Sequence, residues 1–157
     1  MTRIIVLGAG LIGARHVQAV QAHPRCRLVG VVEPNTTLHT EKSVRYYNSL
    51  QDVCDLVDGA IIATPTRLHA ANSIACAERG WHVLVEKPVT DSLRAADHLA
   101  FALQRYGVRS LVGHHRRHHP SVQRLKELVT NSIGTPLTAT LIWAMPKPEG
   151  YFQDRKG

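Results

Sequence analysis

The stretch RIIVLGAGLIGARH, residues 3–16, decides the fold, because a short apolar run passes directly into a glycine-rich turn and then into a helical pattern. Arg3 to Leu7 is nearly continuous in apolar residues, as in a strand that is buried on both faces. Leu11 to Ala22 carries apolar residues at helical spacing until His23-Pro24 ends the pattern. The turn between them, Gly8-Ala9-Gly10-Leu11-Ile12-Gly13, has the spacing GxGxxG.

A strand before this motif and a helix after it are the context in which GxGxxG predicts a dinucleotide site. Gly8 permits the tight turn, Gly10 lets a pyrophosphate approach the backbone, and Gly13 allows the helix to pack closely on the strand. Leu11 and Ile12 open the helix, whose N-terminus attracts phosphate charge. The alternative is a glycine-rich turn that binds no ligand.

Short apolar runs and helical patterns alternate along the rest of the chain, which predicts an α/β fold built on a doubly wound parallel sheet. Further strands are expected at 27–32, 44–47, 59–63, 82–85 and 109–112, further helices at 35–43, 66–79, 91–106 and 120–131, and a helical turn at 49–53. Beyond Pro120 the pattern changes, and Leu137 to Trp143 alternates like a strand of a second, α+β domain. We therefore expect a dinucleotide-binding domain over 1–119, followed over 120–157 by a connecting helix and the beginning of a substrate domain.

Glu33 follows the second predicted strand, 20 residues after Gly13. A carboxylate at this position can accept both ribose hydroxyls of adenosine and would repel a 2′-phosphate. No arginine follows it directly, since the next residues are Pro34 and Asn35. The pattern therefore favours NAD over NADP, the alternative being a solvated acidic residue in a turn.

Two further segments lie at the carboxyl ends of predicted strands, where ligands bind in open α/β sheets. Thr64-Pro65-Thr66 follows the fourth strand, and Pro65 is expected to form a rigid wall beside the nicotinamide ribose. Thr66 could simply cap the next helix, and His69 is either a site residue or an ordinary histidine on a helix face. Glu86 and Lys87 close the fifth strand, where a partly desolvated lysine could donate or accept a proton near neutral pH; an exposed lysine before a turn proline is the alternative.

The chain is basic, with 19 lysines and arginines against 12 acidic residues and a net charge of +7, which suits nucleic acid or an anionic cofactor equally. The positive residues are dispersed except at His114 to His119. Histidines four apart there could bind a metal on a helix, but Gly113 and Pro120 favour an extended segment or a loop, so we predict no metal site. Without nearby aromatic residues this run also gives little support for nucleic-acid binding.

Three dispersed cysteines and no CxxC spacing indicate free thiols in a reducing compartment, and we expect a cytoplasmic protein. The apolar run from Ile4 to Ile12 superficially resembles a signal peptide, but its glycines and the following Arg15 and His16 argue against export. No stretch reaches the length of a membrane span, so no membrane partner is expected.

The motifs GAGLIG, VVEP, ATPTRLH, VLVEKPV and VGHHRRHHP, in this order and spacing, resemble the Gfo/Idh/MocA (glucose-fructose oxidoreductase / inositol dehydrogenase) family over essentially the whole chain. The resemblance implies NAD(P)-dependent hydride transfer to or from a hydroxylated small molecule such as a sugar or polyol. It implies that Lys87 is catalytic beside the substrate hydroxyl, and that Glu86 and Pro88 shape the cofactor cleft. It also implies that Arg116 or Arg117 lies near the domain junction.

Family members are about twice as long as one ordinary domain, and their second domain supplies an aspartate and a histidine to the substrate site. No residue after Gly157 is present to match those two, so the chain resembles the nucleotide-binding half of such an oxidoreductase. The first alternative is a non-catalytic NAD-binding module, from a truncated gene product or an excised domain. A basic interaction protein that uses the His/Arg run is a weaker one. Substrate identity and oligomeric state are not predicted.

Overall fold

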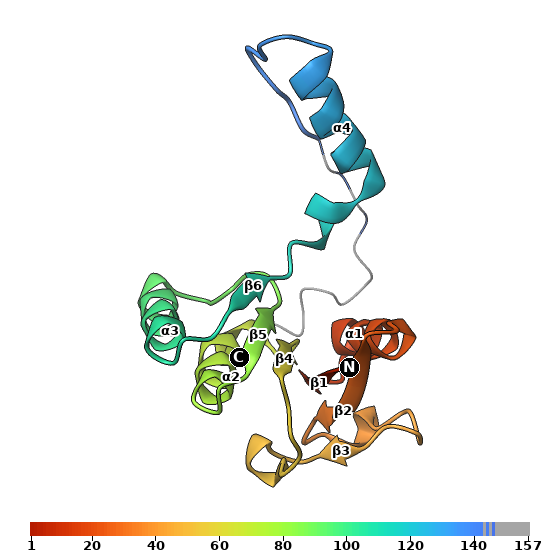
Figure 1. The fold of residues 1–157 in the computed structure, drawn as a ribbon, viewed down its shortest axis with the longest axis vertical. Coiled ribbons are helices and arrows are strands. Elements are labelled where there is room, and N and C mark those ends of the chain that lie inside the picture. The colour runs from red at the N-terminus through yellow and green to blue at the C-terminus, as the bar shows by residue number, and fades with distance from the viewer. Residues whose placement is uncertain (143, 145, 147–157) are drawn as a thin grey trace. The chain divides into compact units, whose positions relative to one another are not determined.

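The structure, a computed structural model, describes residues 1–142, 144 and 146. Its first compact unit comprises Met1–His115, and the second begins at Arg116. The first unit contains a six-stranded sheet in the order β3-β2-β1-β4-β5-β6, in which all neighbouring strands are parallel (Figure 1). The strands are β1 (Thr2–Leu7), β2 (Cys26–Val32), β3 (Tyr46–Tyr47), β4 (Gly59–Ile62), β5 (His82–Val85) and β6 (Ser110–Val112).

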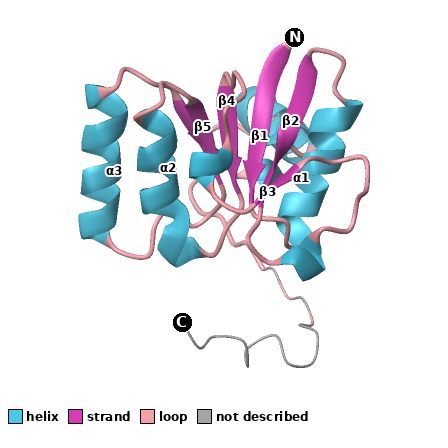
Figure 2. Ribbon diagram, turned by 90° about the horizontal axis from the view of Figure 1, so that it is seen from below, coloured by secondary structure: helices cyan, strands magenta, loops and turns pink. Residues whose placement is uncertain are grey.

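Helices cover both faces of this sheet, which confirms the predicted doubly wound α/β fold (Figure 2). α1 (Leu11–Ala22) lies on one face, and α2 (His69–Ala77) and α3 (Leu93–Arg105) lie on the other. The described residues also form four short 3-10 turns: η1 (Thr36–Leu38), η2 (Leu50–Asp52), η3 (Thr66–Leu68) and η4 (His115–His118), the last of which begins at the final residue of the first unit. The helical turn predicted at 49–53 corresponds to η2.

The core forms two layers, one on each face of the sheet. Ile5, Leu7, Ile62 and Val85 contribute to the larger layer, into which Cys76 of α2 also packs. Val6, Val31 and Val17 of α1 form the smaller layer together with Val44. Alternate residues of β1 therefore enter opposite layers, which is the burial on both faces that its continuous apolar sequence predicts.

Helix faces differ from the sequence pattern at their first turns. Leu11 and Leu93 were the natural first members of the apolar stripes of α1 and α3, yet they are 74% and 86% exposed. The buried positions in α1 are Gly13, Val17 and Val20. The first residue of each helix is therefore exposed, although the spacing of apolar residues placed it on the buried face.

Two predicted elements are wrong in extent or in kind. The helix expected over 35–43 is reduced to η1, because Asn35 caps only this turn and His39 leaves it to stack on Tyr46. The strand expected at 137–143 is absent over residues 137–142, and its Trp143 lies outside the described residues. Leu137 and Leu141 are 92% and 89% exposed, and within the described residues no strand pairs with this segment.

The second unit contains the predicted helix α4 (Pro120–Asn131), with Pro120 in its first turn and His119 as its cap. The interpretation of 120–157 as a connecting helix and the beginning of a substrate domain stays a prediction. Within the described residues, no helix combines the length and the apolarity needed to cross a membrane.

Candidate functional site

The glycine motif forms the turn from β1 into α1, at the point where the order of strands reverses between β1 and β4. Gly8 has a φ of +97°, a left-handed conformation that favours glycine. A Cβ on Gly8 would also lie 2.6 Å from the carbonyl oxygen of Ala63, at the end of β4. A Cβ on Gly13 would collide with the carbonyl group of Gly8. These two glycines are therefore required by the close approach of the backbone itself.

Gly10 differs from Gly8 and Gly13 because no contact within the protein requires a glycine at this position. It caps the N-terminus of α1 with φ −62°, and a Cβ there would meet no atom within 4 Å. The space over Gly10 is open at the start of a helix whose first N–H groups face outward. An open approach to a helix N-terminus is what a dinucleotide pyrophosphate requires, so the loop fits the group that its sequence predicts.

Glu33 follows β2, and its carboxylate is fixed by two backbone groups. Oε2 accepts from the N–H of Ala9 at 2.9 Å, and Oε1 accepts from the N–H of Asn35 at 2.9 Å. The residue is only 9% exposed. Glu33 is thus not the solvated turn residue of the alternative interpretation. Each carboxylate oxygen has a further lone pair, so both can still accept a ribose hydroxyl.

A cleft of about 470 Å³ lies at the carboxyl ends of β4 and β5. Several predicted site residues share it, namely Ile12, Thr64, Pro65, His69, Glu86 and Lys87. The cleft also contains Thr66, which had been considered as a helix cap, and residues that were not assigned to the site, namely Arg15, His16, Ala19, Ala63 and His115. Gly8, Gly10, Leu11, Gly13 and Glu33 do not line it; they belong to the glycine turn and its neighbour. The structure therefore separates the predicted residues into a glycine-loop group and a cleft group.

His69 is buried in the wall of this cleft and is 2% exposed. Its Nδ1 lies 2.8 Å from the carbonyl oxygen of Pro88, and its Nε2 lies 2.8 Å from that of Thr64. The ring therefore bridges the segments that follow β4 and β5. It is neither an ordinary helix-face histidine nor a group that reaches a ligand through a ring nitrogen, because both nitrogens are engaged.

Thr66 and Lys87 differ from their expected environments. Thr66 lies within η3, whose capping residue is Pro65, and it makes no capping hydrogen bond. Thr64 instead receives a hydrogen bond from the amide of Asn72 at 3.1 Å. Lys87 was expected to be partly desolvated, but it is exposed, although it lines the cleft.

His16 contacts Glu86 across the cleft, with Nε2 and Oε1 separated by 2.9 Å. Their side chains are 22% and 13% exposed. This link between α1 and the end of β5 was not predicted, although GAGLIGARH places a histidine one helical turn beyond Gly13. Residues three apart lie on the same face of a helix, so the sequence could have indicated that His16 lies on the same face of α1 as Gly13.

The expectation of an extended segment or loop is wrong for the middle of the His/Arg run, because His115–His118 form the 3-10 turn η4, whereas His114 and His119 lie outside it. Gly113 ends β6, but the proline at 120 restricts only the residue directly before it, so a turn still forms upstream. Within the described residues, no three His, Cys, Asp or Glu side chains group as metal ligands would.

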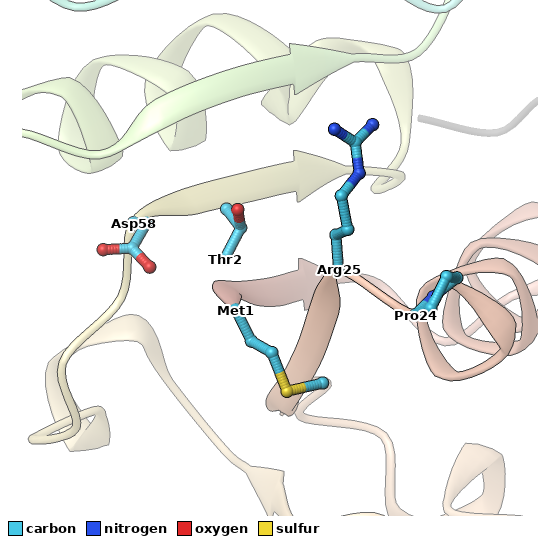
Figure 3. Close-up of a pocket in the computed structure, with 5 residues that line it drawn as sticks. All are labelled: Met1, Thr2, Pro24, Arg25 and Asp58. Carbon is cyan, nitrogen blue, oxygen red and sulfur yellow. The ribbon is translucent and has the colours of Figure 1, made fainter.

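A second hollow, of about 540 Å³, lies at the opposite edge of the sheet (Figure 3). It is lined by Met1, Thr2, Pro24, Arg25 and Asp58, which precede or begin strands. Ligands of doubly wound sheets bind beyond the carboxyl ends of the strands, so this hollow is on the wrong side for a dinucleotide. Asp58 moreover forms an ion pair with Arg3, in which Oδ1 of Asp58 lies 2.5 Å from Nη2 of Arg3.

Comparison with known proteins agrees with this geometry. Residues 2–114 match the Gfo/Idh/MocA oxidoreductase family, whose common domain is an NAD-binding Rossmann fold. The chain belongs to this family. The resemblance seen in the sequence motifs is thereby confirmed, and NAD is the cofactor type of the matched domain.

Individual Gfo/Idh/MocA members are similar over most of this chain. The 4-carboxy-2-hydroxymuconate-6-semialdehyde dehydrogenase of Sphingobium sp. strain SYK-6 is 34% identical over 77% of this chain and 41% of its own length. Inositol 2-dehydrogenase 1 of Mycolicibacterium vanbaalenii is 29% identical over 95% of this chain and 46% of its own. The WlbA dehydrogenase from Bordetella pertussis, solved with NADH and UDP-GlcNAcA, has a TM-score of 0.76 at 27% identity and covers 82% of this chain and 39% of its own. The chain thus spans less than half the length of these relatives.

Proposed function

We propose that this chain supplies the NAD-binding domain of a dehydrogenase that oxidises a CH–OH group of a small hydroxylated molecule. The observation that carries the proposal is the shared cleft, in which Ile12 of the glycine motif lies with Thr64-Pro65 and Glu86-Lys87. A dinucleotide whose pyrophosphate rests on the glycine turn would extend its nicotinamide end toward these segments. The names of the relatives support the substrate class, since one acts on inositol and another on glucose 6-phosphate.

The protein residues would divide the work of binding and of proton handling. The open backbone at Gly10, with Leu11 and Ile12 at the helix start, would hold the pyrophosphate. Glu33 would accept the ribose hydroxyls and repel a 2′-phosphate, which favours NAD over NADP. Thr64, Pro65 and the bridge made by His69 would form the wall beside the nicotinamide ribose. Bound nicotinamide supplies the hydride acceptor, which no side chain can provide.

Lys87 is the residue that we assign to the substrate. Lys87 lines the cleft and is exposed, so its ammonium can hydrogen-bond a substrate hydroxyl and, once deprotonated, accept the proton of that hydroxyl. Positioned proton transfer of this kind typically contributes about 10²–10⁴-fold to a rate. Lys87 would therefore be the catalytic residue, and Glu86 would help to shape the cleft.

Titration with NADH, followed by its fluorescence, tests the binding part of the proposal. The 157-residue chain is expected to bind NADH, and to bind NADPH more weakly. Absence of any NADH signal at millimolar cofactor would reject both the dehydrogenase proposal and an NAD-binding module.

Turnover separates those two functions. NADH formation is followed with NAD and a panel of polyols, sugars and sugar phosphates, for the wild type and for Lys87→Ala. A dehydrogenase would lose turnover in Lys87→Ala while its NADH affinity stays the same. Binding without turnover on any member of the panel would favour the non-catalytic module.

A further inference from the structure

The Glu86 carboxylate is held on three sides. Oε1 contacts Nε2 of His16 at 2.9 Å, and Oε2 accepts from the backbone N–H of Lys87 at 3.2 Å. Gly113, at the end of β6, lies against the same carboxylate, since a Cβ on Gly113 would be 2.9 Å from Oε1. The carboxylate has no room to turn toward β6, and its contact with His16 keeps it on the α1 side of the cleft.

Lys87 directly follows Glu86, yet its ammonium has no carboxylate partner among the described residues. Both residues line the same cleft, where a free Glu86 carboxylate could form an exposed ion pair with the ammonium. The Glu86 carboxylate instead lies 2.9 Å from Nε2 of His16. Other groups that can carry positive charge line the same cleft, namely Arg15, His69 and His115. Glu86 is the one acidic residue in the lining of this cleft.

We propose that His16 is a positioning residue, which holds the Glu86 carboxylate away from Lys87 and so keeps the Lys87 ammonium available to a ligand. The inference rests on the proposed function for its biological meaning, but the contact it concerns belongs to the protein alone. Loss of the His16 hydrogen bond would release Glu86 to pair with Lys87. Pairing would stabilise the ammonium and lower the nucleophilicity of the lysine.

The test replaces His16 with Gln and with Asn, two side chains that end in the same amide group but differ in length. In His16→Gln the side-chain amide reaches the position of Nε2 and can donate to Glu86, whereas in His16→Asn it reaches only the position of Nδ1. The readout is the rate at which acetic anhydride acetylates each lysine at fixed pH, measured by peptide mass spectrometry. Lys42, which is exposed in the segment between β2 and β3, is the internal control.

We expect acetylation of Lys87 to be roughly two- to fivefold slower in His16→Asn than in the wild type, the range of an exposed ion pair. His16→Gln should restore the wild-type rate, and Lys42 should be unaffected in both variants. The effect of His16→Asn should vanish when Glu86→Gln is added, because the amide cannot pair with an ammonium. An unchanged Lys87 rate in a folded His16→Asn, or equal slowing in His16→Gln, would overturn the proposal.

A second measurement covers the case in which His16→Asn does not fold. Glu86→Gln alone removes the only acidic group of the cleft lining, and the proposal expects it to leave the Lys87 rate near that of the wild type, since the two are not paired there. Faster acetylation in Glu86→Gln would show that they are already paired and would refute the inference. Titration with NADH and ADP-ribose separates this result from the proposed function: failure of both ligands to bind the wild type rejects the function, whatever the lysine rates show.

Discussion

Glu33 is hydrogen-bonded to the glycine turn, since its Oε2 accepts from the backbone N–H of Ala9 at 2.9 Å. The end of β2 and the turn after β1 are thereby fixed to each other. The carboxylate is also held by the N–H of Asn35, so its orientation is set before any ligand arrives. Such preorganisation reduces the entropy that binding must overcome.

Glu33→Gln should therefore weaken binding of NADH more than binding of NADPH. The amide places an N–H donor against either Ala9 or Asn35, and the negative charge that repels a 2′-phosphate is lost. Hydrogen bonds to charged groups contribute about 1.5–3 kcal/mol, so NADH affinity should fall by about tenfold or more. Fluorescence titration with both cofactors measures the change. Glu41→Gln, an acidic residue bonded instead to Gln21 and Ser43, is the control and should leave both affinities unchanged.

Gly10→Ala and Gly13→Ala should separate cofactor binding from folding. An alanine Cβ at position 10 meets nothing within 4 Å, so the midpoint of thermal unfolding should not change. It would nevertheless fill the space over the helix N-terminus and reduce NADH affinity by about tenfold or more, as the loss of one charge-assisted hydrogen bond would. If Gly10→Ala binds NADH normally, the pyrophosphate does not approach there.

In Gly13→Ala the methyl group collides with the Gly8 carbonyl, and overpacking of this kind costs about 1–3 kcal/mol. Its unfolding midpoint should therefore drop, in contrast to that of Gly10→Ala. Calorimetry or circular dichroism without any ligand gives the comparison. Equal midpoints for the two variants would contradict the packing role of Gly13.

The Arg3–Asp58 pair should make stability depend on pH in the acid range. Hydrogen bonds from the Arg3 side chain and backbone hold the pKa of Asp58 well below its ordinary value. A carboxyl whose pKa is lower in the folded state stabilises the fold above its unfolded pKa of about 3.9, and this contribution is lost as pH falls further. Asp58→Asn should lower the urea midpoint at pH 7 and flatten its fall between about pH 5 and pH 3. Parallel pH profiles for the two proteins would exclude this pair as the cause.

Sequence reasoning predicted the strands and the glycine turn because those features are local. The apolar run of β1 predicts a strand, and the spacing of Gly8, Gly10 and Gly13 predicts the turn, from about a dozen consecutive residues. The pairing of His16 with Glu86 could not be obtained that way. It joins residues 70 apart, and only the parallel order of β1, β4 and β5 brings α1 beside the end of β5.

Burial was the other quantity that the sequence did not supply. Lys87 and His69 are both polar residues in segments that follow strands, yet Lys87 is exposed and His69 is buried, with only 2% of its surface exposed. What distinguishes them is the presence of two carbonyl groups, on Thr64 and Pro88, at the right distance from the imidazole. Backbone acceptors have no signature in the sequence, so the bridge that His69 makes was unpredictable.

His69→Ala should destabilise the protein and weaken NADH binding together. It leaves two carbonyl groups of the cleft wall without their partner and creates a cavity at a site that is 2% exposed. The combined effect should be about 2–5 kcal/mol in the free energy of urea unfolding. His69→Gln retains a donor near the Nε2 position, toward Thr64, and His69→Asn retains one near Nδ1, toward Pro88. If the bridge shapes the cleft, each should recover part of the stability, and the better binder of NADH identifies the wall segment that the cofactor contacts. A His69→Ala variant that binds NADH as the wild type does, despite lower stability, would limit the bridge to a folding role.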